Sequence, residues 1–276
     1  MRFSAAAASE IAALLREAAQ AEILPRFRRL ASGDIRAKSG PLDLVTEADE
    51  AAERRLSAAL AARYPTALIL GEEATAADPA LLTRMLEAEL CFVLDPVDGT
   101  ANFAGGVPLF GVMLAAVHHG ETIAGWIHDP MGDDTAIALR GEGAWIEAPS
   151  GHRVGCRVAA PAPLGRMVGA ISWGFLPPER KAHLLPRLSQ LAGTLNFRCA
   201  AHEYRLAATG GLHALVYNKL MPWDHAAGAL LHAEAGGYSA QFDGGAYSPR
   251  KHTGGLICAP DVAGWQALRE GLLGLQ

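Results

Sequence analysis

The chain has 276 residues, of which 50% are hydrophobic and 19% are charged, and its formal net charge at pH 7 is −5. This composition excludes a disordered chain, and the length allows a substantial buried core. The acidic balance argues against nucleic acid as a partner, because proteins bind phosphate backbones with faces rich in lysine and arginine.

The cysteine pattern and the hydropathy pattern bear on where in the cell the protein is expected. The four cysteines are widely scattered and form no C-x-x-C pair, so they indicate neither a zinc site nor a disulfide framework. No apolar run approaches the ~20 residues of a membrane span, and the N-terminal apolar positions follow helical spacing. We therefore expect a cytoplasmic protein that does not bind membranes.

Helical and strand-like patterns alternate along the first half of the chain. The expected elements are helices at 4–30 and 47–64, and strands at 67–70, 91–94, 111–117, 122–127, 134–139 and 144–146. The turn His118–Glu121 should join two of these strands as a hairpin.

The composition becomes polar around Pro149–Gly151, and we place a domain boundary there, between residues 1–150 and 151–276. The expected elements of the second half are strands at 167–171, 212–217 and 255–258, and helices at 179–192, 201–209 and 224–236. This mixture of sheets and helices favours a mixed α/β fold, a layered α/β sandwich.

The segment Leu94–Phe103 is the most informative part of the chain. Asp95 and Asp98 follow a short apolar run, and close carboxylates repel each other unless a cation lies between them or one is protonated. Carboxylates, backbone carbonyls and waters are the ligands that Mg2+, Mn2+ and Ca2+ prefer. Taken alone, however, the D-x-x-D-G pattern is equally compatible with an ordinary turn.

Three further acidic segments each have a structural explanation. Glu72 and Glu73 follow the apolar run 67–70. Asp224 occupies the expected N-cap of a helix, and Thr46 with Asp49 forms an expected capping pair at the start of another.

Together, the four segments resemble the inositol monophosphatase family of metal-dependent phosphatases. The family pattern is matched by D-L-V-T-x-x-D, G-E-E, D-P-x-D-G-T-x-N-F and W-D-x-A-A-G, at Asp43–Asp49, Gly71–Glu73, Asp95–Phe103 and Trp223–Gly228. The resemblance runs from about Lys38 to Gly237. It implies alternating α-β-α-β-α layers, a lithium-sensitive phosphatase and a homodimer.

The resemblance also implies a metal site. One ion would be held by Glu72, Asp95 and the carbonyl of Val97, and a second by Asp95, Asp98 and Asp224. A third, weaker ion would reach Glu72 through waters. The expected ion is Mg2+, with Mn2+ as the alternative. Independently of the family, several gathered carboxylates need divalent cations to offset their charge.

The catalytic residues implied by the resemblance are Asp49, Thr100 and Glu72. Asp49 would pair with Thr100 and help to deprotonate a metal-activated water that attacks the phosphate directly. Gly99, Thr100 and Ala101 should begin a helix whose free N–H groups bind the phosphate. Lys38 is expected either to neutralise the site or to lie on the surface. His225 is expected to point away from the metals.

The substrate wall departs from the family pattern. Where inositol monophosphatases carry an acid that contacts the inositol ring, this chain has Tyr217. Arg198, Lys219 or Arg205 could instead bind a second anionic group, although Arg205 could equally pair with Glu203 or another acid. We therefore expect a Mg2+-dependent phosphomonoesterase that acts on a small phosphorylated metabolite.

Two alternatives accompany this expectation. The same chemistry could act on fructose 1,6-bisphosphate, histidinol phosphate or 3′-phosphoadenosine 5′-phosphate. A protein of another class, a catalytically idle regulator that binds metal or metabolite, would lack a metal acid or the threonine. The chain carries all of them.

Overall fold

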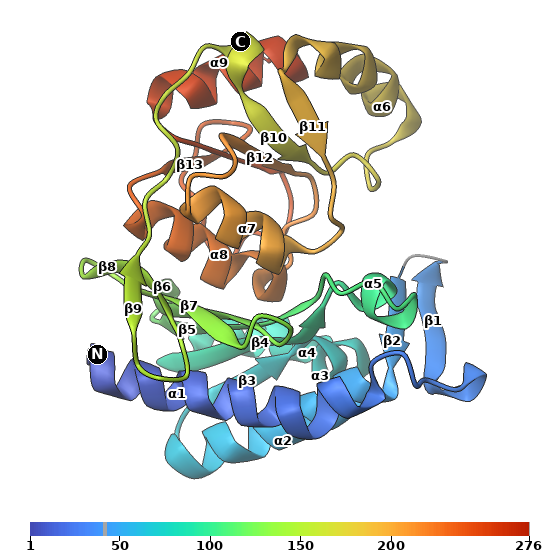
Figure 1. The fold of residues 1–276 in the computed structure, drawn as a ribbon, viewed down its shortest axis with the longest axis vertical. Coiled ribbons are helices and arrows are strands. Elements are labelled where there is room, and N and C mark those ends of the chain that lie inside the picture. The colour runs from blue at the N-terminus through green and yellow to red at the C-terminus, as the bar shows by residue number, and fades with distance from the viewer. Residues whose placement is uncertain (41–42, 276) are drawn as a thin grey trace.

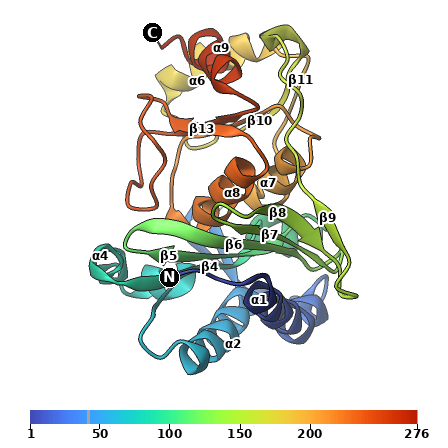
Figure 2. The same cartoon turned by 90° about the vertical axis from the view of Figure 1, so that its left-hand side faces the viewer.

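The computed structural model describes residues 1–40 and 43–275, and these form alternating layers of helices and sheets (Figures 1 and 2). Helices α1 (Ala5–Ala18) and α2 (Glu47–Arg63) cover the outer face of a seven-stranded sheet. Helices α7 (Ala200–Ala208) and α8 (Pro222–Glu234) lie between this sheet and a second one.

The second sheet has five strands, and its outer face is covered by α6 (Pro178–Leu184) and α9 (Val262–Leu273). The order of layers is therefore α-β-α-β-α, and the predicted sandwich is confirmed. The site-bearing helix α8 packs against the middle strands of the larger sheet.

The strands of the larger sheet lie in the same order in space as in the sequence. Its strands are, in spatial order, β3 (Leu68–Gly71), β4 (Leu90–Asp98), β5 (Gly111–His118), β6 (Glu121–Asp129), β7 (Asp134–Leu139), β8 (Gly143–Glu147) and β9 (Arg153–Gly155). The first two strands are parallel and all later neighbours are antiparallel. The predicted hairpin is confirmed: His119 and Gly120 have φ values of 49° and 83°, as a tight two-residue turn requires.

The smaller sheet is mixed. Its spatial order is β11 (Gly193–Leu195), β10 (Val168–Ile171), β12 (Ala214–Tyr217), β14 (Leu256–Ala259) and β13 (Tyr238–Gln241). Strand β10 is parallel to both of its neighbours, whereas β14 is antiparallel to both of its own. The chain passes from the larger sheet to the smaller one after Gly155, and the proposed division at residue 150 into two domains remains a prediction.

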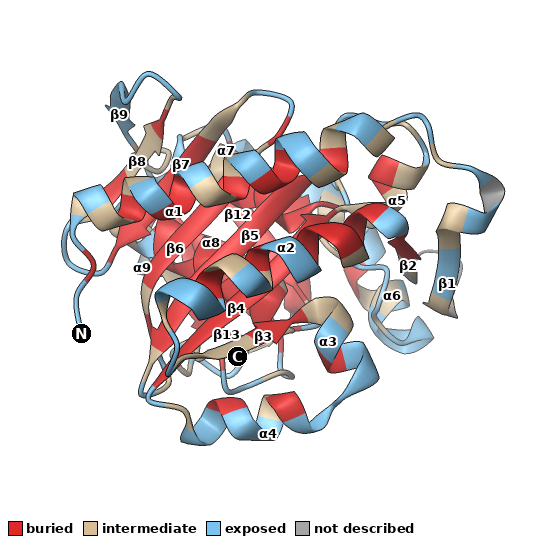
Figure 3. Ribbon diagram, turned by 90° about the horizontal axis from the view of Figure 1, so that it is seen from below, coloured by how far each residue is buried: buried red, intermediate tan, exposed pale blue. Residues whose placement is uncertain are grey.

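Three hydrophobic cores lie between the layers. Phe92 and Leu94 of β4 face the core beneath α1 and α2, whereas Cys91 and Val93 face the core beneath α7 and α8. Because both faces of the strand are buried, its sequence reads as a continuous apolar run rather than an alternating one. Figure 3 shows α1 and α2 with their buried faces toward the sheet and their exposed faces outward.

Two predicted helices are shorter than expected. The helix predicted at 4–30 is α1 only to Ala18; a π turn and a short 3-10 turn at Leu24–Arg26 follow. The helix predicted at 179–192 ends as α6 at Leu184 and continues as a 3-10 turn to Gln190. Pro186 explains the second difference, because proline lacks the N–H that continues an α-helix and its ring clashes with the preceding turn. Pro25 lies in the 3-10 turn and ends the helical segment there, but the change to a π turn at Ala19 comes earlier than its influence reaches.

An antiparallel hairpin of β1 (Ile35–Gly40) and β2 (Asp43–Thr46) leads into α2 and lies beside the short helix α5 (Thr100–Ala104) (Figure 1). No helix in the described part of the chain is both long enough and apolar enough to span a membrane.

Candidate active site at the end of strand β4

A β-bulge at the end of β4 turns two aspartates toward the same cavity. Asp95 lies opposite Met113 of β5 and Asp98 lies opposite Gly111, so two residues of β4 face one residue of β5. In a regular strand, residues three apart point to opposite faces, whereas the extra residue of a bulge changes this alternation. Pro96 lies within the bulge, where its missing N–H costs no regular ladder bond.

The cavity beside this bulge has a volume of ≈ 470 Å³. Its lining includes these candidate site residues from the sequence: Glu72, Asp95, Val97, Asp98, Gly99, Thr100, Ala101, Arg198, Tyr217, Lys219 and Asp224. Asp49 does not line the cavity and instead contacts Thr100 from behind.

Three carboxylates from separate elements meet in this cavity. Oxygen atoms of Glu72, Asp95 and Asp224, from α3 (Glu72–Ala77), β4 and α8, all lie within 4.8 Å of one another. Burial, and then the negative charge of Glu72, raises the pKa of Asp95 and of Asp224 well above the usual range. Such a group is unstable without a cation, and its oxygen-only ligands fit Mg2+, Mn2+ or Ca2+.

Asp98 is oriented by the first turn of α7. Its Oδ2 accepts a 2.6 Å hydrogen bond from the backbone N–H of Ala201 and a 3.0 Å bond from Sγ of Cys199. Burial nevertheless raises the pKa of the Asp98 carboxyl. The N-terminal end of a helix favours negative charge, so α7 holds this carboxylate at the cavity wall.

Asp224 is not the N-cap that the sequence predicted. Helix α8 begins at Pro222, its N-cap is Met221, and Asp224 is the third helical residue. Proline is favoured at the first helical position, where its fixed φ suits the helix and no N–H is needed. The earlier start places Asp224 in the first turn, where its carboxylate lines the cavity.

His225 also lines the cavity, but its ring nitrogens contact other protein atoms and not the acids, as expected. Its Nδ1 lies 3.1 Å from the hydroxyl of Tyr204 and its Nε2 lies 2.8 Å from the carbonyl oxygen of Lys219. Burial lowers the pKa of His225 to about 4. Because both ring nitrogens contact protein atoms, this histidine positions α8 rather than binding a metal.

The predicted capping pair is confirmed, and its acid has a second partner. Asp49 accepts a 2.8 Å bond from the backbone N–H of Thr46 and a 3.0 Å bond from the hydroxyl of Thr100. The Thr100 hydroxyl also lies 3.0 Å from the carbonyl oxygen of Val97. Asp49 is 1% exposed, and burial raises its pKa to about 6.

Gly99 permits the turn between β4 and α5. Its φ of 88° lies in the left-handed region, and a Cβ atom there would lie 2.8 Å from the carbonyl oxygen of Leu109. A larger residue would therefore be strained and sterically blocked. The helix predicted to begin at this loop is confirmed as α5, with Gly99 as its N-cap.

A buried acid that the sequence analysis missed holds the start of α3. Glu53 of α2 accepts bonds of 2.9 Å and 2.7 Å from the backbone N–H groups of Glu73 and Ala74. A Cβ atom on Gly71 would lie 2.2 Å from Cδ of Glu53, so the glycine of the G-E-E segment makes room for this carboxylate. Glu53 thereby fixes the position of Glu72.

Lys38 lies at the site rather than on the open surface. Its Nζ donates a 2.8 Å bond to Glu72 and a 2.6 Å bond to Glu73. Burial lowers the pKa of Lys38, but the charges and hydrogen bonds of the two glutamates outweigh it and raise the pKa above its ordinary value. In this structure Lys38 supplies part of the positive charge that the acids require.

A carboxylate does reach the substrate wall, from a position that the motif did not indicate. The hydroxyl of Tyr217 donates a 2.9 Å bond to Glu203 of α7, whose other oxygen accepts a 2.8 Å bond from the N–H of Phe197. Glu203 lines the cavity, and burial raises its pKa to about 7. Sequence spacing alone contained no sign of this pairing, since Glu203 and Tyr217 belong to different elements.

Arg205 does not line the cavity. It donates to the carbonyl oxygen of Ile127 and forms an ion pair with Asp134. The structural interpretation of Arg205 is confirmed, with Asp134 rather than Glu203 as the acid.

The lining of the cavity also includes cations and aromatic rings. Arg198 and Lys219 line it, as does Lys181, which the sequence analysis missed. The loop 172–175 contributes two exposed rings: Nζ of Lys181 lies 5.8 Å from the ring of Trp173, and Nζ of Lys219 lies 5.4 Å from that of Phe175. These residues can attract an anionic group and cover an apolar one.

The chain is similar in sequence to proteins of one known family. A model of the inositol monophosphatase family matches residues 3–275. The inositol-1-monophosphatase SuhB of Mycobacterium tuberculosis is 34% identical over 233 residues, which are 83% of this chain and 79% of that protein. The Nus factor SuhB of Pseudomonas aeruginosa is 35% identical over 212 residues, 73% of each chain.

Solved structures show the same fold. The extragenic suppressor protein suhB of Bartonella henselae superposes with a TM-score of 0.80 at 27% identity, covering 96% of this chain and 98% of that one. The IMPase of Thermotoga maritima superposes with a TM-score of 0.77 at 24% identity, covering 97% and 95%. From its acidic motifs, its layered fold and its match over nearly the whole length, the chain belongs to the inositol monophosphatase family.

Proposed function

We propose that this protein is a Mg2+-dependent phosphomonoesterase that hydrolyses a small phosphorylated metabolite. One observation carries the proposal. The acid cluster of Glu72, Asp95 and Asp224 lies in the same cavity as Thr100, and Thr100 is hydrogen-bonded to the buried acid Asp49. A metal site and a proton acceptor are thus adjacent.

The oxygen-rich donor set fits divalent ions. Glu72, Asp95 and the Val97 carbonyl would hold one, and Asp95, Asp98 and Asp224 a second, with a third at Glu72. When bound, the ions supply Lewis acidity, which lowers the pKa of water and offsets the charge of the phosphate. Mg2+ is the proposed ion and Mn2+ the alternative, because both prefer carboxylate and carbonyl oxygens.

The remaining chemistry belongs to the side chains and backbone of the chain. Asp49 would accept the proton of the attacking water through the hydroxyl of Thr100. A pKa of about 6 suits this role, because a general base works best when its pKa lies near the working pH. The first backbone N–H groups of the loop at Gly99, Thr100 and Ala101 would bind the phosphate oxygens.

The walls of the cavity support a substrate with hydroxyl groups and a second anionic group. Glu203 and Tyr217 can bind hydroxyls, as the acid of inositol monophosphatases would. Arg198 and Lys219 can bind a carboxylate or phosphate. Inositol 1-phosphate, fructose 1,6-bisphosphate, histidinol phosphate and 3′-phosphoadenosine 5′-phosphate are therefore the substrates to test. A homodimer and a cytoplasmic location are further proposals.

An idle regulator is the competing proposal, and one relative carries the name of a Nus factor. The chain argues against this proposal because it keeps every expected acid and the threonine: Asp49, Glu72, Asp95, Thr100 and Asp224. A protein without catalysis would not need Thr100 beside Asp49.

A phosphate-release panel tests the proposal. The four esters named above are incubated with the protein in Mg2+, in EDTA, and in Mg2+ with Li+. We expect EDTA-sensitive, lithium-inhibited turnover of at least one ester. The absence of turnover of all four by folded, Mg2+-bound protein would contradict the proposed activity and favour the regulator.

A further inference from the structure

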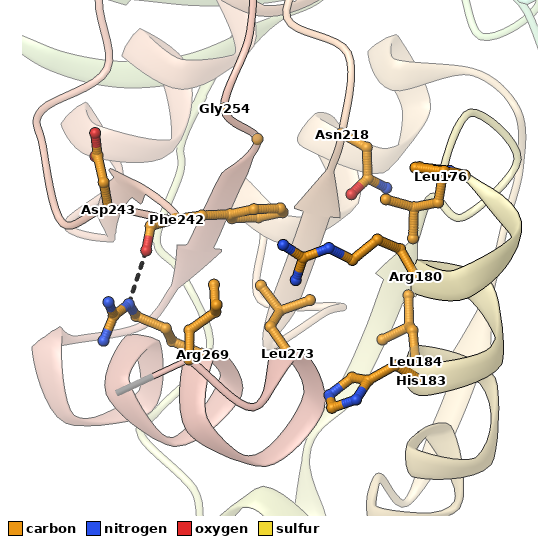
Figure 4. A pocket seen from close by; sticks show the side chains of 13 residues that line it. Leu176, Arg180, His183, Leu184, Asn218, Phe242, Asp243, Gly254, Arg269 and Leu273 are labelled. Carbon is orange, nitrogen blue, oxygen red and sulfur yellow. Dashed lines mark hydrogen bonds between the residues drawn. The ribbon is translucent and has the colours of Figure 1, made fainter.

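A second cavity, of ≈ 550 Å³, lies in the second half of the chain between α6, α9 and the end of β13 (Figure 4). It shares no lining residue with the active-site cavity. Leu176, Leu184, Phe242 and Leu273 form apolar walls, and Arg180 extends from α6 across the space toward Phe242. A volume of this size is typical of small-molecule sites.

Polar atoms without partners face or border this cavity. Oδ1 of Asn218 and Nε2 of His183 are buried and have no hydrogen-bond partner within residues 1–40 and 43–275. Arg180 is an exposed residue, and its guanidinium forms no ion pair or hydrogen bond with that part of the chain, so it is open to a ligand. Arg269, by contrast, donates a 2.7 Å bond to the carbonyl oxygen of Phe242. Because buried polar atoms are normally paired, the cavity has unmet hydrogen-bonding capacity.

The chemistry of these groups defines a ligand. A guanidinium binds a carboxylate through two parallel hydrogen bonds, and Oδ1 of Asn218 requires a donor such as a hydroxyl. The ring of Phe242 and the leucines favour a flat apolar body. Asp243, which also lines the cavity, disfavours a doubly charged phosphate more than a singly charged carboxylate.

The wall of this cavity is continuous with that of the active site. Ser172, Trp173, Gly174 and Phe175 line the active-site cavity, whereas the next residues, Leu176 and Pro177, line the second one. The side-chain amide of Asn218 donates to the carbonyl oxygen of Ser172, and the neighbours of Asn218, Tyr217 and Lys219, line the active site.

We propose that the second cavity is an effector site for a small hydroxylated aromatic carboxylate, and that its occupant changes substrate affinity through the loop 172–177. The carboxylate pairs with Arg180, the ring packs on Phe242 and the hydroxyl donates to Asn218. A ligand shifts a conformational equilibrium only by contacting one state better, and Leu176 and Asn218 are the contacts through which the occupant would favour one position of the loop. The effect on affinity rests on the proposed phosphatase activity; the binding does not.

Binding is tested with 4-hydroxyphenylacetate by titration calorimetry on the full chain in EDTA, where the acid cluster cannot hold a metal and attract the carboxylate. We expect saturable binding with a Kd of about 1 mM or tighter. Arg180→Gln should weaken it by about tenfold or more, because a charged hydrogen-bond pair is lost. Leu275→Trp, which narrows the same cavity, should also weaken it. Arg166→Gln, at an exposed arginine outside both cavities, is the matched control and should change nothing.

Three results would overturn the site: no saturable binding to the wild-type chain, equal binding to Arg180→Gln, or loss of binding in Lys219→Gln, which would locate the probe in the active-site cavity. The coupling has its own readout. At saturating probe, KM for the ester turned over in the phosphate panel should change by about twofold or more in the wild type and not in Arg180→Gln. An unchanged KM in the wild type would overturn the coupling while leaving the binding result intact.

Discussion

The hydroxyl of Thr100 lies 3.0 Å from a carboxylate oxygen of Asp49 and 3.0 Å from the carbonyl oxygen of Val97. One small group therefore joins the first turn of α2 to the loop that follows β4. The other carboxylate oxygen of Asp49 accepts a hydrogen bond from the backbone N–H of Thr46. The position of Asp49 is therefore set by the helix cap and not by the residues that line the cavity. This arrangement favours a proton acceptor that is fixed before substrate binds.

The first prediction concerns this pair. Thr100→Val and Asp49→Asn should each lower kcat by about 100-fold to 10,000-fold, because each removes the path by which a proton leaves the attacking water. KM should change much less, since neither residue's proton transfer contributes to ground-state binding. Steady-state kinetics on the best ester of the panel measures both constants.

Thr100→Ser is the control for this prediction, because serine keeps the hydroxyl and should retain most of kcat. The double variant should be little worse than either single variant if the residues act as one unit. Multiplicative losses in the double variant would contradict a shared proton path.

The second prediction concerns stability without metal. Asp95→Asn should raise the stability of the protein in EDTA, because it removes a buried negative charge that Glu72 repels. The folded-state pKa of Asp95 lies above its ordinary value of 3.8, so its stabilising contribution is complete below that pH and is lost as the pH rises. The advantage of the variant should therefore grow with pH.

Thermal unfolding in EDTA at about pH 6 and about pH 8 measures this advantage. In Mg2+ the order should reverse, because only the wild type gains the free energy of metal binding. Glu121→Gln, which neutralises an exposed acid, is the control and should have little effect. A variant less stable than the wild type in EDTA at both pH values would contradict the repulsion argument.

The third prediction concerns Lys38, which pairs with Glu72 at 2.8 Å. Lys38→Gln should tighten Mg2+ binding by about fivefold, because the ammonium no longer competes with the ion for this carboxylate. Calorimetric titration with Mg2+ measures the change. Lys251→Gln removes the same charge from a residue that binds Gln241 away from the cavity, and should leave Mg2+ affinity unchanged. Weaker Mg2+ binding in Lys38→Gln would show that the lysine supports the metal site instead.

The fourth prediction concerns acid stability. His232 of α8 is 2% exposed and contacts Ser239 at 3.0 Å, and burial lowers its pKa to about 4, from 6.5. The unfolded chain therefore binds a proton more readily than the folded one. The stability contributed by the neutral ring is complete above pH 6.5 and is lost as the pH falls toward 4.

Urea unfolding in EDTA at about pH 7.5 and about pH 5 should show that His232 accounts for about 2 kcal/mol of the loss in the wild type. Over the same pH interval, the unfolding free energy of His232→Gln should fall by about 2 kcal/mol less than that of the wild type. His152→Gln, at an exposed histidine, should behave as the wild type does. An identical loss in wild type and His232→Gln would contradict the assignment.

Sequence motifs located the acids that follow strands and begin helices, because such positions are marked by apolar runs, glycine and proline. Asp95, Asp98 and Glu72 are of this kind. Glu53 and Glu203 are not: each lies inside a helix, and each reaches its partner only because two layers pack together. No local pattern separates them from solvent-exposed glutamates.

The layers and the central strands of the fold could also be predicted, whereas the ends of two helices and some short strands could not. The layers followed from the resemblance and the central strands from their apolar runs. The predicted end of α6 was wrong because helical periodicity extends through Pro186, where the backbone cannot follow it. The helical segment that begins with α1 ends at the 3-10 turn that contains Pro25, short of the predicted residue 30. The short strands β11 and β13 carry few apolar residues, so their pairing depends on the neighbouring strands and left no clear pattern in the sequence.

The most direct test of the account is phosphate release from the panel esters by the wild-type chain and by Asp95→Asn, each in Mg2+ and in EDTA. Asp95 is the acid assigned to both proposed metal positions, so we expect turnover by the wild type in Mg2+ alone and a loss of about 100-fold or more in the variant. Full turnover by Asp95→Asn, or wild-type turnover that EDTA does not reduce, would contradict metal-dependent hydrolysis at this site.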